Sequence, residues 1–131
     1  MNYKLKRELV SNAIAVSVTI DEGRRLKMIL DTGASNTTID SNMLYLYGYS
    51  LNNCIGKVLI ETANGIIETE VFEILSLTAF GITRKNFQIQ VYDFIAHGIM
   101  SDYNGLLGLD FFEGTKFCID TVENEISITE K

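Results

Sequence analysis

The stretch Leu26-Lys27-Met28-Ile29-Leu30-Asp31-Thr32-Gly33 joins an apolar run directly to an Asp-Thr-Gly triplet. No second Asp-Thr-Gly and no Asp-Ser-Gly occurs in the 131 residues. A single carboxylate cannot act as acid and base toward one bond at the same moment, whereas two carboxylates about 3 Å apart can share a proton and divide the roles. If the triplet is catalytic, a second chain must supply the other half of the site.

Apolar and polar residues alternate with a period of two around this triplet, which is the pattern of half-buried strands. Apolar residues occupy every second position of the segment 14–20, and Asp21-Glu22-Gly23 then predicts a turn into the segment 24–30. Together they predict a β-hairpin whose second strand ends at Asp31.

The rest of the chain also predicts mainly strands. Asn64-Gly65, a dipeptide that favours tight hairpin turns, lies between the strand-like segments 57–63 and 66–77. Further strands are expected near residues 37–39, 87–92, 116–119 and 125–129, with turn residues around Gly81 and Lys85-Asn86. The charged segment 4–8 fits either a terminal strand or a frayed arm.

Two short helices complete the expected elements. Asp40 is a candidate N-cap for a brief helix over residues 41–45, and the segment 106–112 predicts a strand that passes into a second short helix. We therefore expect a single all-β domain over residues 1–131, without internal repeats.

The composition argues against several classes of partner. Eleven Lys and Arg residues against 17 Asp and Glu residues give a net charge of -6, whereas binding to a phosphate backbone needs concentrated basic surface. No apolar run approaches the length of a transmembrane helix. Ala13-Ile14-Ala15 resembles a signal-peptidase site, but Glu8, Ser11 and Asn12 interrupt the stretch before it, so we reject a signal peptide. We expect no nucleic-acid partner, no membrane partner and a cytoplasmic location.

Histidine and cysteine are too sparse for most other catalytic or metal sites. His97 is the only histidine, and Cys54 and Cys118 form no Cys-x-x-Cys pair. A metal site needs several such ligands, and a Ser-His-Asp or Cys-His mechanism would depend on His97 alone. We expect no metal, no cofactor, a loop position for His97 beside Gly98, and buried free thiols.

Three motifs occur in the order and approximate spacing of one known family. They are Ile29-Leu30-Asp31-Thr32-Gly33-Ala34-Ser35, the Asn64-Gly65 hairpin, and Gly105-Leu106-Leu107-Gly108-Leu109-Asp110. With these motifs the chain resembles the retropepsin-like (retroviral-type) aspartic proteases over about residues 10–129, and its tail looks closer to cellular and bacterial members than to viral ones. The resemblance implies an acid-protease fold, a closed or partly open β-barrel with a flap hairpin, that forms half of a twofold-symmetric dimer.

The resemblance assigns the chemistry to Asp31 from each of two chains. One carboxylate deprotonates a bound water while the other, protonated, hydrogen-bonds the scissile carbonyl oxygen, so the peptide bond is hydrolysed without a covalent intermediate. Thr32 would bond across the twofold axis, and Gly33 would let the backbone turn beneath the carboxylates. The strand Leu106-Leu107 would pass beside this loop, and Gly108 would permit close approach because it has no Cβ.

The resemblance also implies a substrate cleft under a flap whose tip is Asn64-Gly65. Such a flap adds main-chain hydrogen bonds to an extended peptide and excludes bulk water. The residues expected to bind substrate or form the flap are Ala34, Thr62, Ala63, Asn64, Gly65, Ile66, Leu106, Leu107 and Gly108. Ile60 and Ile66, together with the two leucines, suggest apolar cleft walls and hence a preference for apolar peptide segments.

Two positions depart from related patterns. Many viral members have Arg directly after the glycine of the third motif, and this Arg pairs with an acidic residue near the catalytic loop. Here the position of the Arg is Leu109. Position 36 is Asn, and no carboxylate occurs among the five residues after Gly33. The dimer must then be held by other contacts, such as apolar ones or terminal strands.

Ala34 stands where two-lobed pepsin-like enzymes usually have Ser or Thr, whose hydroxyl can stabilise an ionised carboxylate. We therefore expect activity at mildly acidic to near-neutral pH.

The leading hypothesis is therefore a homodimeric aspartic endopeptidase that acts on peptide or protein substrates. One alternative is a catalytically silent retropepsin-like module that binds a peptide or mediates dimerisation. A weaker alternative is a β-barrel interaction domain in which Asp31-Thr32-Gly33 is coincidental. The oligomeric state discriminates among them, because a strict monomer cannot assemble a pair of carboxylates.

Overall fold

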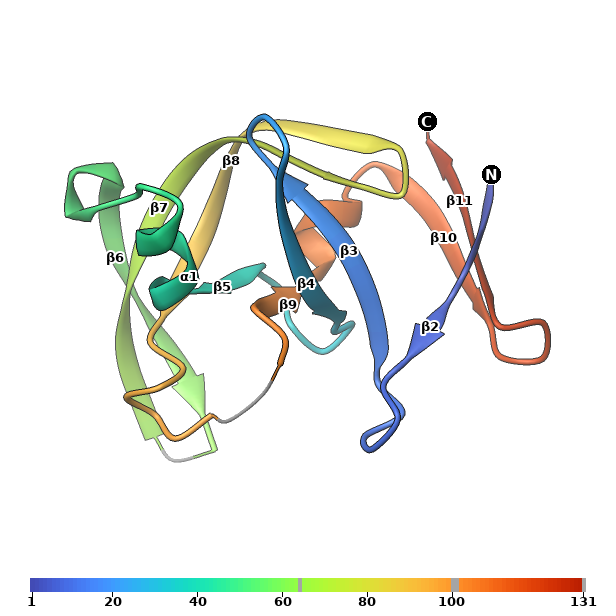
Figure 1. Ribbon diagram of the computed structural model, residues 1–131, viewed down its shortest axis with the longest axis horizontal. Helices are drawn as coiled ribbons and strands as arrows, with labels where there is room; N and C mark the ends of the chain where they lie inside the picture. The colour runs from blue at the N-terminus through green and yellow to red at the C-terminus, as the bar shows by residue number, and fades with distance from the viewer. Residues whose placement is uncertain (64, 100–101, 131) are drawn as a thin grey trace.

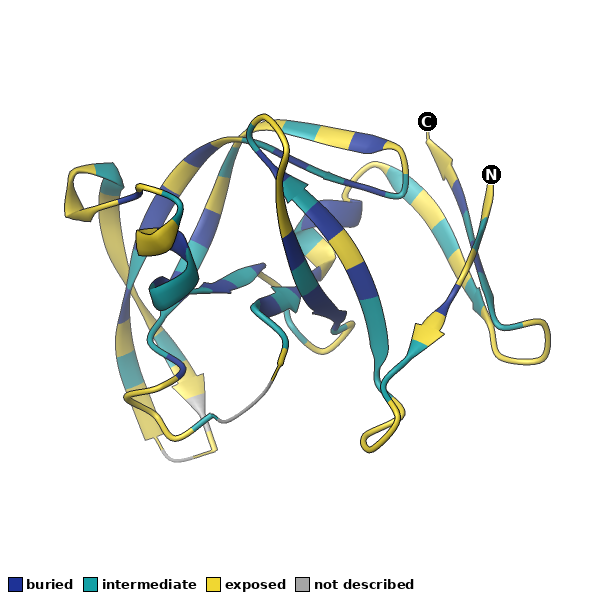
Figure 2. Cartoon of the chain, viewed as in Figure 1, coloured by how far each residue is buried: buried dark blue, intermediate teal, exposed yellow. Residues whose placement is uncertain are grey.

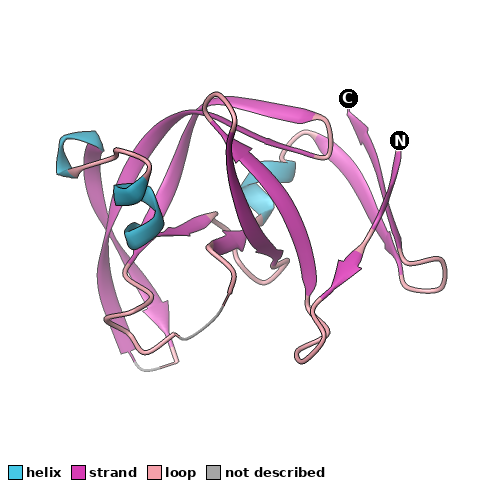
Figure 3. Cartoon of the chain, viewed as in Figure 1, coloured by secondary structure: helices cyan, strands magenta, loops and turns pink. Residues whose placement is uncertain are grey.

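The computed structural model describes residues 1–63, 65–99 and 102–130, which form mainly strands with few helical turns (Figure 3). The strands are β1 (Asn2–Lys4), β2 (Lys6–Arg7), β3 (Ile14–Ile20), β4 (Arg24–Leu30), β5 (Thr38–Asp40), β6 (Cys54–Thr62), β7 (Gly65–Ala79), β8 (Ile82–Tyr92), β9 (Gly105–Leu107), β10 (Thr115–Asp120) and β11 (Glu125–Glu130). The helical elements are α1 (Ser41–Leu46) and the 3-10 turns η1 (Leu51–Asn53) and η2 (Leu109–Phe112).

An eight-stranded sheet forms the body of the molecule, in the order β2-β3-β4-β9-β5-β8-β7-β6 (Figure 1). The sheet also folds back on itself, because β3 pairs with β7 through Thr19↔Thr78 and Ile20↔Leu77. This extra pairing gives the partly closed barrel that the resemblance implied. It also makes the all-β prediction correct.

Tight turns with left-handed residues join consecutive strands. Asp21 (φ 50°) and Gly23 (φ 85°) lie in the turn between β3 and β4. Phe80 (φ 52°) and Gly81 (φ 73°) connect β7 to β8, and two successive positive φ angles match the right-handed twist of the flanking strands. The predicted hairpin before Asp31 is confirmed, with Ala15↔Ile29 to Ile20↔Arg24 in register.

The core lies between the two sides of the folded sheet, and buried residues alternate with more accessible ones along strands such as β3, β7 and β11 (Figure 2). Side chains exposed by no more than 1% come from elements along most of the chain, and they include Val18, Ile20, Met28, Ile39, Leu44, Phe72, Ile74, Leu77, Ile89, Leu107, Phe111 and Ile126. Burial of this apolar surface is the main driving force that holds the strands together.

The 15-residue strand β7 connects the barrel to a projecting hairpin. Its second half pairs with β8, from Glu70↔Val91 to Ala79↔Ile82. Its first residues pair with β6 alone, up to Thr62↔Gly65. The β6–β7 hairpin therefore extends beyond the barrel, at the lower left of Figure 1.

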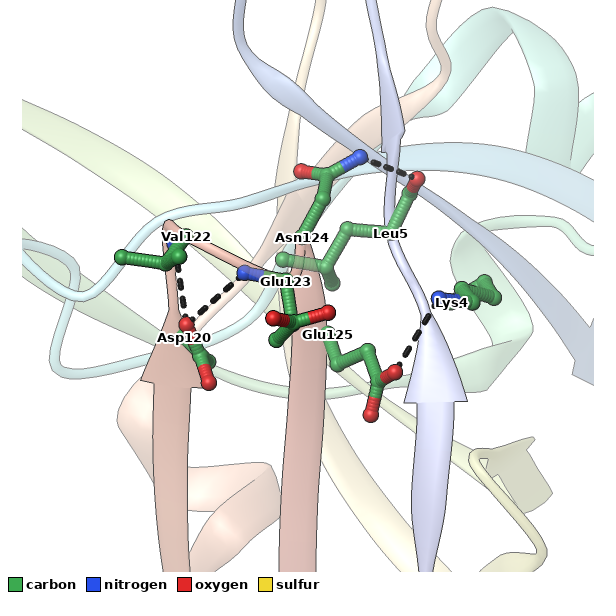
Figure 4. A network of polar contacts seen from close by, with 7 residues as sticks. All are labelled: Lys4, Leu5, Asp120, Val122, Glu123, Asn124 and Glu125. Carbon is green, nitrogen blue, oxygen red and sulfur yellow. Dashed lines mark hydrogen bonds and ion pairs between the residues drawn. The ribbon is translucent and has the colours of Figure 1, made fainter.

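Both ends of the described chain join one small antiparallel sheet, in the order β1-β11-β10. Leu5 N–H donates to the Asn124 carbonyl (2.9 Å), and the Asn124 side-chain amide donates to the Leu5 carbonyl (3.1 Å). Lys4 forms an ion pair with Glu125 (3.0 Å), as Figure 4 shows. The charged segment 4–8 thus begins in terminal strands rather than in a frayed arm.

Both short helices are found, and α1 has the predicted N-cap, since Asp40 accepts a hydrogen bond from Asn42 N–H (3.3 Å). Two details differ from expectation. Strand β8 begins at Ile82 and continues through Lys85-Asn86, where Asn86 takes φ 50° within the strand instead of ending it. Cys54 and Cys118 are both free, but neither is buried: Cys54 is half-buried, and Cys118 is exposed because it occupies an outward position of the alternating strand β10.

Candidate active site

Asp31 lies directly after β4, where the parallel neighbour β9 fixes its backbone. Leu30 pairs with Leu107, and the Asp31 N–H donates to the Leu107 carbonyl (3.0 Å). The loop then turns back on itself: Gly33 N–H donates to Asp31 Oδ1 (2.9 Å), and Ala34 N–H donates to the Asp31 carbonyl (3.1 Å). Neighbouring strands and the loop's own amides therefore set the orientation of this half-buried carboxylate.

Gly108 allows the segment after β9 to cross the Asp31 loop in direct backbone contact. A Cβ at this position would lie 2.7 Å from the Asn36 carbonyl carbon and 2.8 Å from the Ala34 carbonyl oxygen. The next residue closes the contact, because Leu109 N–H donates to that Ala34 oxygen (2.8 Å). The structure thus brings Asp31-Thr32-Gly33-Ala34 and Leu106-Leu107-Gly108 together.

A side-chain clamp that the sequence reasoning missed holds the far end of the same loop. Thr37 is fully buried, and its N–H donates to both carboxylate oxygens of Asp110 (3.0 Å each). The Thr37 hydroxyl donates to Asp110 Oδ1 (2.7 Å) and accepts from Gly108 N–H (3.1 Å). The viral pattern would place an ion pair in this region, whereas here a carboxylate binds a neutral hydroxyl and an amide.

One signal in the sequence could have pointed to this clamp. Asp110 stands between Leu109 and the pair Phe111-Phe112, and a carboxylate in an apolar segment needs hydrogen-bond donors. The identity of the donor was not readable, because Thr37 lies 73 residues away and many other Ser and Thr side chains compete for that role.

The surface beside Asp31 is open in the single chain. Thr32 and Gly33 are exposed, and Leu109, at the position where viral members have Arg, leaves 42% of its surface accessible. Among the residues that the structure describes, the only hydrogen bond recorded for the Asp31 carboxylate comes from Gly33 N–H. Within the described ranges, therefore, no second carboxylate bonds to Asp31.

A cleft of about 640 Å³ lies between this loop and the projecting hairpin. The loop contributes residues 33–36 to one wall, and residues 58–61 of β6 form the other. Between the walls lie Thr38 from β5, Gln90 from β8 and Leu106 from β9. The cleft begins two residues after Asp31 and lies against the β6–β7 hairpin, the region in which the resemblance implies a substrate cleft.

The predicted flap and cleft residues lie at several different places. Ala34, Ile60 and Leu106 line the cleft. Leu107 does not, because its side chain is fully buried in the core, so its expected position in a cleft wall is corrected. Ile66 is 70% exposed on the hairpin and does not line the cleft in the single chain.

The hairpin tip is described only in part. Gly65 (φ 119°) is the first residue of β7 and pairs with Thr62, while Ala63 is exposed in the turn. The predicted turn residue Asn64 lies outside the described residues. The hairpin itself is confirmed, although Gly65 belongs to a strand rather than to the loop.

His97 takes no part in the Asp31 site. Its ring stacks on Tyr92 (centroids 4.1 Å apart), and its Nδ1 lies 2.8 Å from the Asp93 carbonyl oxygen. Hydrogen bonds from the Ala96 N–H and, with a smaller effect, from the Asn42 side chain hold the pKa of the Asp93 carboxyl below its usual value.

In the described ranges, no cluster of three or more His, Cys, Asp or Glu side chains could hold a metal ion. None of the described helices could span a membrane.

Comparisons with known proteins agree with this geometry. A model of the aspartyl protease family matches residues 16–111. The structure is similar to that of a retropepsin-like aspartic protease from Rickettsia conorii, with a TM-score of 0.66, 20% sequence identity, and coverage of 99% of this chain and 90% of that chain. No curated protein matches the sequence. Since the family model spans more than half of its length, the chain belongs to the aspartyl protease family, and its fold is retropepsin-like.

Proposed function

We propose that the protein is a homodimeric aspartic endopeptidase whose catalytic dyad consists of Asp31 from each chain. The observation that carries the proposal is the fixed position of a single carboxylate. Asp31 is bonded through its backbone to Leu107 and through its side chain to Gly33, the first residue of its loop that lines the cleft. Membership of the aspartyl protease family supports the reaction class.

Hydrolysis would follow from two such carboxylates held face to face. One accepts a proton from a bound water while the other donates a hydrogen bond to the scissile carbonyl oxygen, and the two groups then exchange roles as the amine leaves. The Gly33 N–H donates to Asp31 Oδ1 (2.9 Å) and so helps to hold one carboxylate in place. Thr32, exposed in the single chain, is free to contact the opposing loop, as the dyad requires.

The exposed surface around Asp31 supports a twofold partner. Thr32 and Gly33 are accessible, and Leu109 adds an apolar side chain beside them. Apolar contact at Leu109 would replace the ion pair of the viral pattern. In the terminal sheet, β11 is the central strand, so β1 and β10 each leave an outer edge to which strands of the partner could add.

The projecting β6–β7 hairpin would act as the flap over the bound peptide. It pairs with the barrel only through residues 70–79 of β7, so its projecting end would be able to approach the cleft and withdraw from it. An extended peptide in the cleft would add main-chain hydrogen bonds to this edge.

Digestion of an unbiased peptide library tests the proposal. Asp31→Asn should lower the rate of cleavage at least about a hundredfold, because it removes general acid-base catalysis. Glu22→Gln makes the same change of charge in the β3–β4 turn, at the opposite end of β4, and should leave the rate unchanged. Equal cleavage by wild type and Asp31→Asn would overturn the assignment, as would an active wild-type protein that sediments strictly as a monomer.

The catalytically silent module has its own signature in the same experiment. It would bind peptides with wild-type affinity in Asp31→Asn and cleave none of them in either protein. An intact Asp31-Thr32-Gly33 with a fixed carboxylate favours the protease, since binding alone does not require that carboxylate.

A further inference from the structure

The floor of the cleft is polar, although the sequence suggested apolar walls. Thr38 and Gln90 lie side by side there, because β5 and β8 are parallel and pair these residues directly. Both are half-buried, and both line the cleft. Asn36 adds an amide from the wall formed by the Asp31 loop.

These polar groups have almost no partners within the chain. Among the described residues, no hydrogen bond is recorded for the side chain of Thr38 or Gln90. Asn36 Oδ1 has only a long contact with the Ser35 hydroxyl (3.5 Å). Covering such donors and acceptors with a ligand strips their water and costs free energy, unless the ligand supplies hydrogen-bond partners.

The charge and shape of the cleft narrow the choice of ligand. Among the described residues that line it, the only ionisable side chain is that of Glu61, which is exposed on β6, so a carboxylate ligand would be repelled while a cation would gain only a screened attraction. Leu106 and Ile60 offer apolar contact to a methylene stem. A neutral side chain with a short apolar stem and a terminal donor and acceptor satisfies both requirements.

We propose that this cleft is a specificity subsite that selects glutamine or asparagine next to the scissile bond, in preference to an aliphatic residue. The inference rests on the proposed protease function, because a scissile bond exists only if the protein cleaves peptides. The preference itself concerns peptide binding. The hydroxyl of Thr38 and the amides of Gln90 and Asn36 each donate and accept hydrogen bonds, as does a primary amide. A leucine in the same place would leave these groups unpaired, which is how a polar site rejects a ligand that lacks the polar group.

A matched peptide series tests the proposal. The peptides differ at a single position, which carries glutamine, leucine, lysine or glutamate. One such set is made for each position that flanks the cleaved bond. The readouts are kcat/KM with wild type and Kd with Asp31→Asn. At one position, wild type should prefer glutamine to leucine by about tenfold, the effect of one or two hydrogen bonds.

Two variants that replace a polar side chain with an apolar one should abolish that preference. Thr38→Val and Gln90→Leu remove the polar groups and should bring the glutamine-to-leucine ratio to about one or below. Gln88→Leu is the matched control, because Gln88 is exposed two residues earlier on β8 and does not line the cleft. It should keep the wild-type ratio.

The outcomes separate this inference from the proposed function. Cleavage with a leucine or lysine preference would leave the protease assignment standing and overturn the subsite. A glutamine preference in Kd without any cleavage would support the subsite while the proposed function failed. A glutamine preference that survives in both Thr38→Val and Gln90→Leu, or binding of none of the peptides, would also overturn the inference.

Discussion

Replacing Thr37 with valine should destabilise the protein because it breaks the clamp between the Asp31 loop and η2. The substitution keeps the shape of the side chain and removes one hydroxyl. That hydroxyl donates to the Asp110 carboxylate (2.7 Å) and accepts from Gly108 N–H (3.1 Å), and Thr37 is fully buried. Both partners would then lose a hydrogen bond, at the buried Gly108 N–H and at the half-buried Asp110 carboxylate.

The magnitude follows from these two contacts. A hydrogen bond to a charged group contributes about 1.5–3 kcal/mol and a neutral one about 0.5–1.5 kcal/mol. The Thr37 N–H still donates to Asp110 in the variant, so part of the interaction remains. We expect Thr37→Val to lower the free energy of unfolding by about 2–4 kcal/mol, which lowers Tm by roughly 10 °C in a domain of this size.

Urea unfolding followed by far-ultraviolet circular dichroism measures the loss, at one fixed protein concentration because a dimer gains stability with concentration. Thr38→Val is the matched control: the next residue also has a hydroxyl, but no hydrogen bond of its side chain is recorded among the described residues. It should unfold within about 0.5 kcal/mol of wild type. Equal stability of Thr37→Val and Thr38→Val would refute the clamp, and so would a double-mutant cycle with Asp110→Asn that shows no coupling.

Three further predictions concern other parts of the site and the fold. Gly108→Ala should lower both stability and activity, measured by Tm and kcat/KM, because its Cβ would meet backbone at 2.7 Å; Gly56→Ala, with nothing within 4 Å, should change neither. Burial, and then a hydrogen bond to Asp21, raise the pKa of Tyr49 above 10.0. A raised pKa in the folded state stabilises the fold fully below pH 10.0, and this stabilisation is lost as the pH rises further. Tyr49→Phe should therefore flatten the decline of the free energy of unfolding at alkaline pH. Ala34→Ser should shift the acidic limb of the pH–rate profile downward, because its hydroxyl can stabilise the ionised dyad, and an unchanged limb would contradict this.

The parts of the structure that were predictable from sequence depend on local patterns. Alternation over 14–20 and 24–30 with a turn between them specifies the hairpin that ends at Asp31, because register and turn chemistry are local. Gly108 was predictable as a point of close backbone approach, since glycine alone lacks a Cβ. The helix start at Asp40 followed from its capping chemistry.

The unpredicted parts depend on contacts between distant segments. Thr37 and Asp110 are 73 residues apart, and no periodicity connects them. The polar cleft floor arises from the parallel pairing of Thr38 with Gln90, which depends on the order of strands in the finished sheet. Leu107 looked equivalent to Leu106, but adjacent strand residues point to opposite faces, so one of them lines the cleft and the other fills the core.

The proposed catalysis needs a correctly shaped Asp31 loop and a second loop opposite it. Contacts within one chain meet the first requirement, and only a dimer would meet the second. The Asp31 loop is held from within the chain at three points, by the Leu107 carbonyl, the Gly108 crossing and the Asp110 clamp. Since none of these contacts comes from a partner, dimerisation does not have to shape the loop and has only to bring two finished loops together. In the proposed dimer, the apolar Leu109 would serve that task, because the contact would need to exclude water and not to orient a carboxylate. The absence of the viral ion pair would then remove a contact between the two chains without removing the support for Asp31.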